Sequence, residues 1–551
     1  MEILAVENLS FKYPQCGEKA LENVSFSVSS GEFVAVCGAT ASGKSTLLRM
    51  LKRELTPLGE RFGSVQYKGV DLDALDSYTS ACKIGFVMQR PEQQIVTDKV
   101  WHELAFGLEN MNMPTDVIRR RVAEMSSYFG IEDWFDKNVS ELSGGQKQLL
   151  NLAAVMVMQP ELLILDEPTA QLDPIAASNF IGTLVKLNRE LGLTIIIVEH
   201  RLEDIVPAAD KLIMLEGGKL IGCGAPRAVA GGLDGQHPEL LFGMPAAVRL
   251  YNALSSGVPT SGGADCPLTV REGRSFVTEN YGNKIKSLAS PEFTPPSEPA
   301  LEFRDVFFRY GRELPDVLCG LDFTVYSGEL FCLLGGNGSG KSTALMAAAG
   351  LIKPYAGEIR VFGRKIKDYK NQTLYKNCLA YMPQDVQTVF LHNTVREELA
   401  EVGAKLDALL VDLSQMLDKH PYDLSGGEAQ LAAMAKVLAA NPRLLLLDEP
   451  TKGVDAHARA AITELLKKLR DSGMTTIVVT HDVEFAAECG GRCALFFRGE
   501  ITSCGLPRRF FTENNFYTTA VNRMTRGYYD GAVTIDDAVE LCRQNIDRSA
   551  L

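Results

Sequence analysis

A tandem duplication constrains the fold of this chain more than any other feature. Four short motifs occur twice in the same order, with Lys44 and Lys341 separated by 297 positions and Asp166 and Asp448 by 282. A chain of 551 residues is too long for one domain of about 100–200 residues, so we expect two related domains in tandem. The motif pairs are GATASGKST (38–46) and GGNGSGKST (335–343), LSGGQ (142–146) and LSGGE (424–428), LLILDEPT (162–169) and LLLLDEPT (444–451), and IIIVEH (195–200) and IVVTH (477–481).

The first motif of each copy is a glycine-rich loop between an apolar, β-prone run and a helical one. Successive backbone N–H groups in such a loop, with the positive end of a helix behind it, bind phosphate oxygens. The lysine is expected to reach the β- and γ-phosphates, and the serine after it to ligate Mg²⁺. A chance glycine-rich turn would not recur in the same context. The predicted phosphate-binding residues are Gly38, Ala39, Thr40, Ala41, Ser42, Gly43, Lys44, Ser45 and Thr46, and Gly335, Gly336, Asn337, Gly338, Ser339, Gly340, Lys341, Ser342 and Thr343.

An Asp-Glu pair follows a short leucine-rich run in each copy, and a histidine ends another apolar run. Ligand sites of α/β sheets lie at the carboxyl ends of such strands. The aspartate is expected to hold Mg²⁺ through water, and the glutamate to orient and deprotonate an attacking water. A solvated acidic turn is the alternative, and two adjacent carboxylates at a strand end without a cation argue against it. The residues are Asp166, Glu167 and His200 in the first copy, and Asp448, Glu449 and His481 in the second, the histidines being expected to contact the γ-phosphate.

With LSGGQ and LSGGE added, the motif set resembles that of the ATP-binding cassette (ABC) ATPases over almost the whole chain. The resemblance implies an α/β fold: two phosphate-loop ATPase cassettes in tandem, each with a RecA-like core, an antiparallel β subdomain and a helical subdomain. It also implies hydrolysis of ATP to ADP and phosphate, with ATP and Mg²⁺ as cofactors. Small C-terminal appendages follow each cassette.

In this family two cassettes pair head to tail, so each ATP lies between the phosphate loop of one and the LSGG motif of the other. The resemblance therefore implies pairing within one chain. An N-capped helix start with serine as the cap is a compatible reading of the same motif. The residues carried over are Ser143, Gly144, Gly145 and Gln146, and Ser425, Gly426, Gly427 and Glu428.

The resemblance also assigns roles outside these motifs. Tyr13 and Tyr310 each precede the phosphate-loop lysine by 31 residues, where the family stacks an aromatic ring on adenine; a strand-end aromatic is the plain alternative. Gln89 and Gln384 match the glutamine that touches Mg²⁺ and begins the segment facing a membrane partner. The segments AQLD and KGVD depart from the commoner SALD pattern, so coupling between the sites is expected to differ in detail.

Residues 86–110 and 516–530 are similar to segments of energy-coupling factor (ECF) transporter ATPases and their cobalt-importer relatives. This subgroup implies a peripheral protein at the cytoplasmic face of the cell membrane. Its partners would be an integral membrane scaffold protein and a separate substrate-capturing membrane protein. The cargo would be a vitamin, a vitamin precursor or a metal ion.

Composition and motif content help to distinguish an importer ATPase of this subgroup from ATPases that act on ribosomes or import sugars. Lys and Arg number 56 against 69 Asp and Glu, a net charge of -13, which argues against nucleic acid as a partner. A double-cassette ATPase acting on ribosomes would favour a long charged linker and a basic surface, whereas 281–299 is rich in Ser and Pro. A sugar-importer ATPase often has one degraded site, whereas both copies here keep Lys, Asp, Glu and His. No apolar run reaches the ~18 residues of a membrane span.

The repeat predicts the domain boundaries: a first cassette at 1–234, an appendage at 235–280, a linker at 281–299, a second cassette at 300–504 and an appendage at 505–551. The echo PLTVRE (267–272) and AVTIDD (532–537) supports the appendages.

The helical subdomains are expected to be unequal. Between the glutamine and the LSGG serine the spacing is 54 residues in the first copy and 41 in the second, which predicts a shortened or missing helix. Apolar residues at helical spacing predict a helix at 117–129 in the first copy and one at 406–417 in the second.

Overall fold

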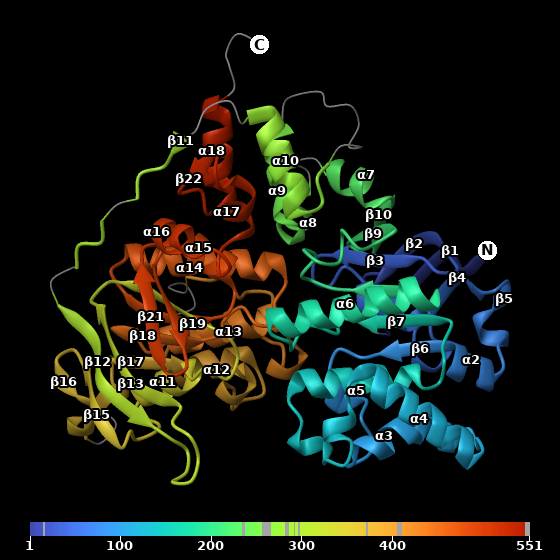
Figure 1. Ribbon diagram of the computed structural model, residues 1–551, viewed down its shortest axis with the longest axis horizontal. Helices are drawn as coiled ribbons and strands as arrows, with labels where there is room; N and C mark the ends of the chain where they lie inside the picture. The colour runs from blue at the N-terminus through green and yellow to red at the C-terminus, as the bar shows by residue number, and fades with distance from the viewer. Residues whose placement is uncertain are drawn as a thin grey trace. The chain divides into compact units, whose positions relative to one another are not determined.

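The computed structural model describes residues 1–14, 17–233, 237–255, 266–281, 286–290, 292–295, 298–370, 373–404 and 410–545 (Figure 1). The chain forms two compact units. The first spans Met1–Val248 with Val258–Thr269, and the second spans Arg249–Gly257 with Val270–Leu551. Both units are α/β, as the sequence predicts.

A small antiparallel sheet opens the first unit, with the strand order β2-β1-β4-β5. Along β2, the apolar residues Leu21, Val24, Phe26 and Val28 are buried, and the residues between them are more exposed. One face of this sheet therefore packs on the core. The strands are β1 (Glu2–Lys12), β2 (Leu21–Ser29), β4 (Glu60–Tyr67) and β5 (Val70–Asp71).

The larger sheet of the first unit has the order β10-β9-β3-β8-β7-β6, parallel except for the β9–β10 pair. Every residue of β7 and β8 is buried, as expected for parallel strands covered on both faces. The strands are β3 (Phe33–Gly38), β6 (Ile84–Val87), β7 (Leu162–Asp166), β8 (Thr194–Val198), β9 (Lys211–Glu216) and β10 (Lys219–Gly224).

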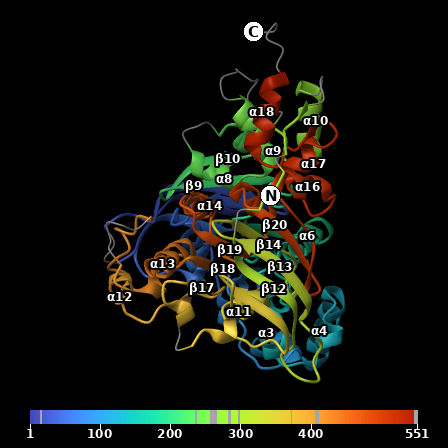
Figure 2. The same ribbon diagram turned by 90° about the vertical axis from the view of Figure 1, so that its left-hand side faces the viewer.

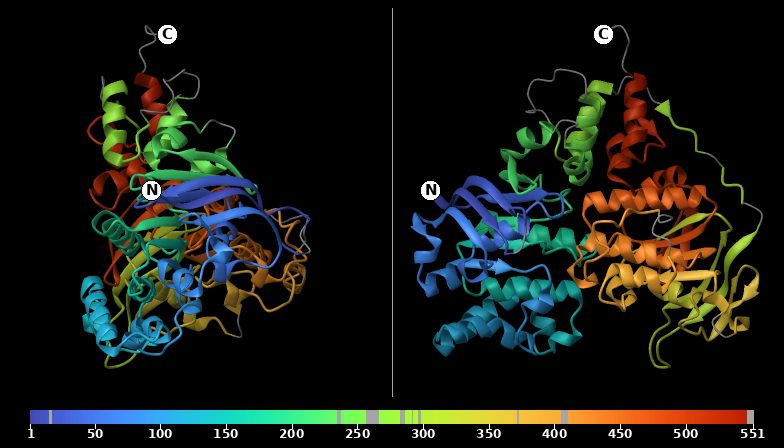
Figure 3. Two further views of the ribbon diagram at one scale, coloured as in Figure 1. Left: turned by 90° about the vertical axis from the view of Figure 1, so that its right-hand side faces the viewer. Right: turned by 180° about the vertical axis from the view of Figure 1, so that it is seen from behind.

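Helices α3, α4 and α5 pack against one another as the helical layer of the first unit (Figure 3). The helix predicted at 117–129 lies within α4, where Val122 and Phe129 are buried. The helices of the first copy are α1 (Lys44–Met50), α2 (Ser77–Lys83), α3 (Val100–Asn110), α4 (Thr115–Phe129), α5 (Gly144–Met156), α6 (Pro174–Leu191), α7 (Pro226–Gly231), α8 (Pro238–Gly243), α9 (Ala246–Ser255) and α10 (Val270–Tyr281).

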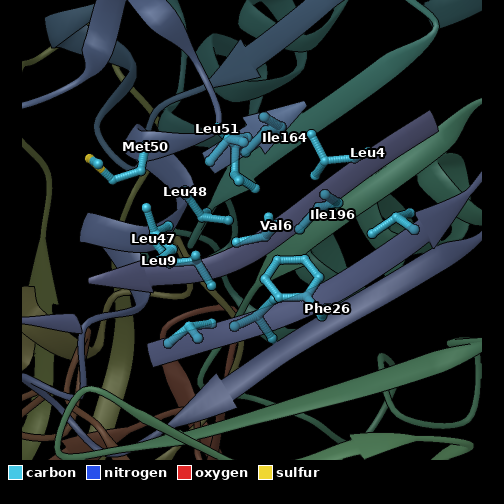
Figure 4. Close-up of a cluster of buried hydrophobic side chains, with 14 of the residues drawn as sticks. Leu4, Val6, Leu9, Phe26, Leu47, Leu48, Met50, Leu51, Ile164 and Ile196 are labelled. Atoms are coloured by element: carbon cyan, nitrogen blue, oxygen red, sulfur yellow. The ribbon is translucent and has the colours of Figure 1, made fainter. Parts of the chain in front are cut away.

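One hydrophobic cluster joins the two sheets of the first unit through α1 (Figure 4). Side chains from the antiparallel sheet, from α1 and from the parallel sheet meet in it, which fixes the helix that follows the glycine-rich loop. The labelled members are Leu4, Val6, Leu9, Phe26, Leu47, Leu48, Met50, Leu51, Ile164 and Ile196.

The second unit repeats both sheets. Its antiparallel sheet has the order β13-β12-β15-β16, and its larger sheet has the order β17-β18-β19-β14-β20-β21. The strands are β12 (Pro299–Phe308), β13 (Leu318–Tyr326), β14 (Leu330–Leu334), β15 (Ala356–Val361), β16 (Arg364–Lys365), β17 (Leu379–Met382), β18 (Leu444–Asp448), β19 (Thr475–Thr480), β20 (Arg492–Phe497) and β21 (Glu500–Gly505).

The helical layer is smaller in the second unit, as the spacing predicts. Helix α12 has 7 residues where α3 has 11, and no α-helix stands in the place of α4 within the described residues. The helix predicted at 406–417 is wrong for its described part, because 410–417 are bends, turns and irregular chain; 405–409 lie outside the described residues. Asp412 accepts a hydrogen bond from the Ser414 amide at 3.0 Å, a local turn that competes with a helix. The helices are α11 (Lys341–Ala348), α12 (Val395–Glu401), α13 (Gly426–Ala439), α14 (Ala456–Asp471) and α15 (Val483–Cys489).

The C-terminal part of the second unit contains α16 (Pro507–Glu513), α17 (Ala520–Thr525) and α18 (Ile535–Asn545). Helix α10 packs against α17 and α18 (Figure 2). Both α10 and α18 begin directly after the threonine of the echoed motif. In addition, β11 (Lys286–Ser287) pairs in parallel with β22 (Tyr529–Asp530). Part of the segment expected to be a linker is therefore built into the second unit.

Among the described residues, no helix combines the length and the apolar character needed to cross a membrane.

Candidate nucleotide sites

The strand order of each parallel sheet gathers the motifs at one edge. In the first unit, β3, β8, β7 and β6 are neighbours with the same direction. Their carboxyl ends lead into the glycine-rich loop, His200, the Asp166-Glu167 pair and Gln89. This edge is where doubly wound sheets bind ligands. The order of the second sheet repeats the arrangement.

The loop lysines are buried and folded into their loops. Lys44 Nζ donates hydrogen bonds of 2.8 Å to the carbonyls of Gly38 and Ala39. Lys341 Nζ donates bonds of 2.9 Å to Gly335 and Gly336. Each ammonium group is therefore held by two backbone carbonyls of its own loop, and a bound phosphate can replace these carbonyls as the acceptor.

Glycine is required where each loop enters its helix. Gly43 has φ 94°, and a Cβ there would lie 2.4 Å from the Ala20 carbonyl oxygen. Gly340 has φ 107°, and its Cβ would lie 2.8 Å from the Val317 carbonyl oxygen. Only glycine adopts this backbone without clash.

Two buried hydroxyls fit a phosphate ligand. Ser42 Oγ and Ser339 Oγ occupy the same position of the two loops, and neither makes a hydrogen bond within the described part of the chain. A buried polar atom without a partner costs free energy. A phosphate oxygen in the loop would supply the missing acceptor.

A hydroxyl and a carboxylate also meet in each copy. Ser45 Oγ donates to Asp166 Oδ1 at 3.0 Å, and Ser342 Oγ donates to Asp448 Oδ1 at 3.0 Å. Burial, together with the charge of the adjacent glutamate, raises the pKa of both aspartates to about 6, although the serine hydrogen bond acts in the opposite direction. Oxygen ligands of this kind suit Mg²⁺, whose charge would remove the cost of the buried carboxylate.

Both glutamates of the Asp-Glu pairs have a strained backbone. Glu167 has φ 46° and Glu449 has φ 50°, a left-handed conformation that costs a non-glycine residue of order 1–3 kcal/mol and is concentrated at functional sites. The turn directs the carboxylate of each glutamate to the histidine of the neighbouring strand.

The two glutamates are held differently. Glu167 Oε1 lies 2.7 Å from His200 Nε2, and Glu167 Oε2 accepts a 2.6 Å hydrogen bond from Gln89 Nε2. Glu449 Oε2 lies 2.9 Å from His481 Nδ1. Gln384 is exposed and makes no hydrogen bond to Glu449 among the described residues. The structure thus brings the glutamine to the glutamate in the first copy only.

The serines of the two LSGG motifs are N-caps of helices, as the sequence predicts. Ser143 Oγ accepts from the Gln146 amide at 3.3 Å at the start of α5. Ser425 Oγ accepts from the Glu428 amide at 3.3 Å at the start of α13. Both form a capping box, in which the residue three positions on bonds back to the serine amide.

The tyrosines lie beside the glycine-rich loops. Tyr13 Oη is 3.1 Å from Thr46 Oγ1, and Tyr310 Oη is 3.1 Å from Thr343 Oγ1. Tyr13 also contacts Phe11 edge to face. Each ring is therefore fixed next to the first turn of the helix after the loop, with 58% of Tyr310 exposed.

Sequence reasoning missed Glu199. This buried residue precedes His200, and its Oε1 accepts a 2.8 Å hydrogen bond from the Thr169 amide in the Asp-Glu-Pro-Thr turn. Burial raises the pKa of Glu199 to about 7. The second copy has Thr480 at this position. The difference between the two repeats, EH against TH, was the available signal.

Comparisons with known proteins agree with this fold. Residues 21–170 and 318–452 match the family model described as ABC transporter. A Bacillus cereus protein named as an ABC transporter ATP-binding protein is 40% identical over 560 residues, covering 98% of this chain and 97% of its own. A Bacillus subtilis protein named as an HMP/thiamine import ATP-binding protein is 30% identical over 528 residues, covering 93% of each. The crystal structure of an archaeal ribosome recycling factor with the stalk protein aP1 shares the fold, with a TM-score of 0.60, 19% identity and coverage of 92% of this chain and 91% of that one.

Proposed function

The chain belongs to the ABC transporter family, as a protein that binds and hydrolyses ATP, and from this premise we propose that it energises an ECF-type importer. The proposed cargo is a vitamin or vitamin precursor, with a metal ion as the other cargo of the subgroup. Similarity to a protein named for HMP/thiamine import supports this proposal. So do residues 86–110 and 516–530, which resemble ECF segments.

The observation that supports ATP hydrolysis at both sites is that the same buried contacts recur in the two copies. Each has a buried lysine in its loop, a Ser–Asp pair and a Glu–His contact. We therefore assign hydrolysis to both sites. In each site the glycine-rich loop and its lysine bind the phosphates, and the tyrosine stacks on adenine.

The proposed metal ligands are Ser45, Gln89 and Asp166 in one site and Ser342, Gln384 and Asp448 in the other. Mg²⁺, when bound, neutralises charge on the phosphates. Glu167 and Glu449 accept the proton of the attacking water, and His200 and His481 orient these carboxylates and contact the γ-phosphate. The LSGG serine and glycines are assigned to the ATP held by the opposite cassette of the same chain.

Substitution of Glu167 or Glu449 by Gln tests the two-site assignment. Loss of a general base lowers turnover at that site by ~10²–10⁴-fold, so steady-state ATP hydrolysis should fall in each single variant. The exposed Glu190, changed to Gln, is the control. Wild-type hydrolysis and transport by the Glu449→Gln variant would refute a second active site.

Membrane docking is proposed at the segments after the two glutamines. Val96 and Leu391 stand at equivalent positions, seven residues after Gln89 and Gln384, and they are 67% and 75% exposed. Large apolar side chains exposed at matched positions fit an interface. The proposed contact is the membrane scaffold protein at the cytoplasmic face of the membrane, which in turn joins the substrate-capturing protein.

Co-purification from a detergent extract tests the proposed partner. The wild-type chain should bring down integral membrane proteins, and the Val96→Asp, Leu391→Asp double variant should lose them while keeping ATP binding. Leu58→Asp is the matched control, because Leu58 is also exposed, at 87%, but lies outside these segments. Recovery of ribosomes instead of membrane proteins would refute the import function.

A further inference from the structure

A glutamate three residues after each histidine accepts a hydrogen bond from the first residue of a helix in the appendage of the same copy. Glu203 Oε2 accepts a 3.0 Å hydrogen bond from the amide of Ala246, the first residue of α9. Glu484 Oε1 accepts a 2.6 Å bond from the amide of Ala520, the first residue of α17. The same contact recurs in both copies. A carboxylate at a helix start is also favoured by the helix dipole.

In the second copy, the segment after His481 is a helix held at both ends. Asp482 caps α15 by accepting from the Phe485 amide at 3.0 Å. Arg459 of α14 joins the two ends of α15, because its guanidinium lies 3.1 Å from Asp482 Oδ2 and 3.1 Å from Glu488 Oε2. The side chain of Arg459 is only 18% exposed, so this charge cluster is largely shielded from solvent.

Residues of both appendages lie near Glu488 or Glu449. Arg249 of α9 lies 3.5 Å from Glu488 Oε1. Tyr517, three residues before α17, packs against the hydrophobic cluster that contains Leu334 and Leu447. Burial, followed by the charge of Glu449, raises the pKa of the Tyr517 hydroxyl. Tyr517 of the second appendage thus packs beside the strand that leads to Glu449, because Leu447 belongs to the same cluster.

The residues that join the two ends of α15 have different counterparts in the first copy. Ala177 and Arg201 stand at the positions of Arg459 and Asp482. Residues 203–208 form turns instead of a helix, and Glu203 is exposed. The hydrogen bond between the glutamate and a helix start is common to both copies, and the Arg459 cluster is formed by residues of the second.

We propose that Glu484 and Arg459 are positioning residues of the second ATP site, which hold His481 in register with Glu449 through α15. Hydrolysis at that site then depends on the hydrogen bond that joins Glu484 of α15 to the first residue of α17. This inference is independent of what the protein transports and rests only on the role assigned to His481.

Two variants of one residue test it. Glu484→Ala removes the acceptor for the Ala520 amide, whereas Glu484→Gln keeps an acceptor oxygen. Misplacement of a catalytic group lowers turnover steeply. For Glu484→Ala we expect kcat for ATP to fall by about two- to tenfold: twofold if the first site works independently, and more if the sites cooperate. KM and the thermal midpoint should stay near wild type, and Glu484→Gln should keep most of the turnover.

Matched variants complete the design. Arg459→Ala should resemble Glu484→Ala in kcat, and Glu203→Ala should have the smaller effect. His481→Ala is the reference: normal turnover in it would overturn the role of the histidine itself, apart from any result at Glu484. Wild-type kcat in Glu484→Ala, or equal losses in Glu484→Ala and Glu484→Gln, would overturn the positioning role. A fall in kcat matched by equal losses of ATP affinity and thermal midpoint would overturn it as well, since it would indicate general unfolding.

Discussion

At the scale of single residues, the two glycine-rich loops have different residues at one position that is left-handed in both. Ala41 has φ 63°, and the equivalent Gly338 has φ 73°. A left-handed conformation costs an L-residue about 1–2 kcal/mol. Glycine avoids this strain but loses more conformational entropy on folding than alanine, which costs about 0.5–1 kcal/mol. Ala41 is exposed, so packing does not offset the strain.

We expect Ala41→Gly to raise the free energy of unfolding by about 0.5–1 kcal/mol, and Gly338→Ala to lower it by a similar amount. No atom lies within 4 Å of a Cβ built at Gly338, so the change tests backbone strain alone. Thermal melting of nucleotide-free protein measures both effects. Shifts of the same sign in the two variants would contradict this account.

Glu199 should make stability depend on pH. Its pKa is raised from 4.5 to about 7 in the folded protein. A group with a raised folded pKa contributes stability that is fully present below about 4.5 and lost as pH rises through about 7. Glu199→Gln keeps an acceptor for the Thr169 amide and carries no charge, so it should remove this dependence.

The thermal midpoint of Glu199→Gln relative to wild type should therefore rise between pH 5 and pH 8. The rise of the pKa from 4.5 to about 7 corresponds to at most about 3.4 kcal/mol. Glu190→Gln, on the exposed side of α6, is the control for the loss of one charge. An unchanged difference between Glu199→Gln and wild type across this range would show that Glu199 stays ionised when buried.

At the scale of elements, the sequence predicted correctly those strands that are determined by a short local run of residues. The runs 162–166 and 194–198 are short, apolar and bounded by polar residues, and both are buried strands. Because strand ends carry the motifs, most of the candidate site followed. In the described part of 406–417 the leucine spacing failed because it reports burial without specifying a helix: Leu413 and Met416 are buried beside α12 and α13, and neither lies in a helix. Likewise, Gln89 bonds to Glu167 whereas Gln384 makes no bond to Glu449 among the described residues. This difference depends on loop conformation, which the shared motif does not encode.

The unequal helical layers predict unequal docking. Helices α3 and α4 have 11 and 15 residues, whereas α12 has 7. We expect the membrane partner to bind in one orientation, so exchange of residues 90–141 with 385–423 should prevent assembly while ATP binding persists. Pull-down of the membrane partner measures this. Normal assembly and transport by the exchanged chain would favour the alternative, a harmless loop deletion on a solvent-exposed face.

At the scale of the whole molecule, the two cassettes share one polypeptide, which raises the effective concentration of each for the other to order mM. We expect the Glu167→Gln, Glu449→Gln variant with bound ATP to be compact and to have the mass of one chain by light scattering. The nucleotide-free protein is the control. A dimer that forms only with ATP would show that the cassettes pair between chains.

The boundary of the repeat and the boundary of the folded unit do not coincide. Helix α10 and strand β11 precede the second repeat in sequence, yet they pack on α17, α18 and β22. A gene cut at the repeat boundary would yield a second half whose α17 has lost its covering helix and whose β22 has lost its neighbour. A second repeat expressed alone would therefore need new residues in place of α10 and β11.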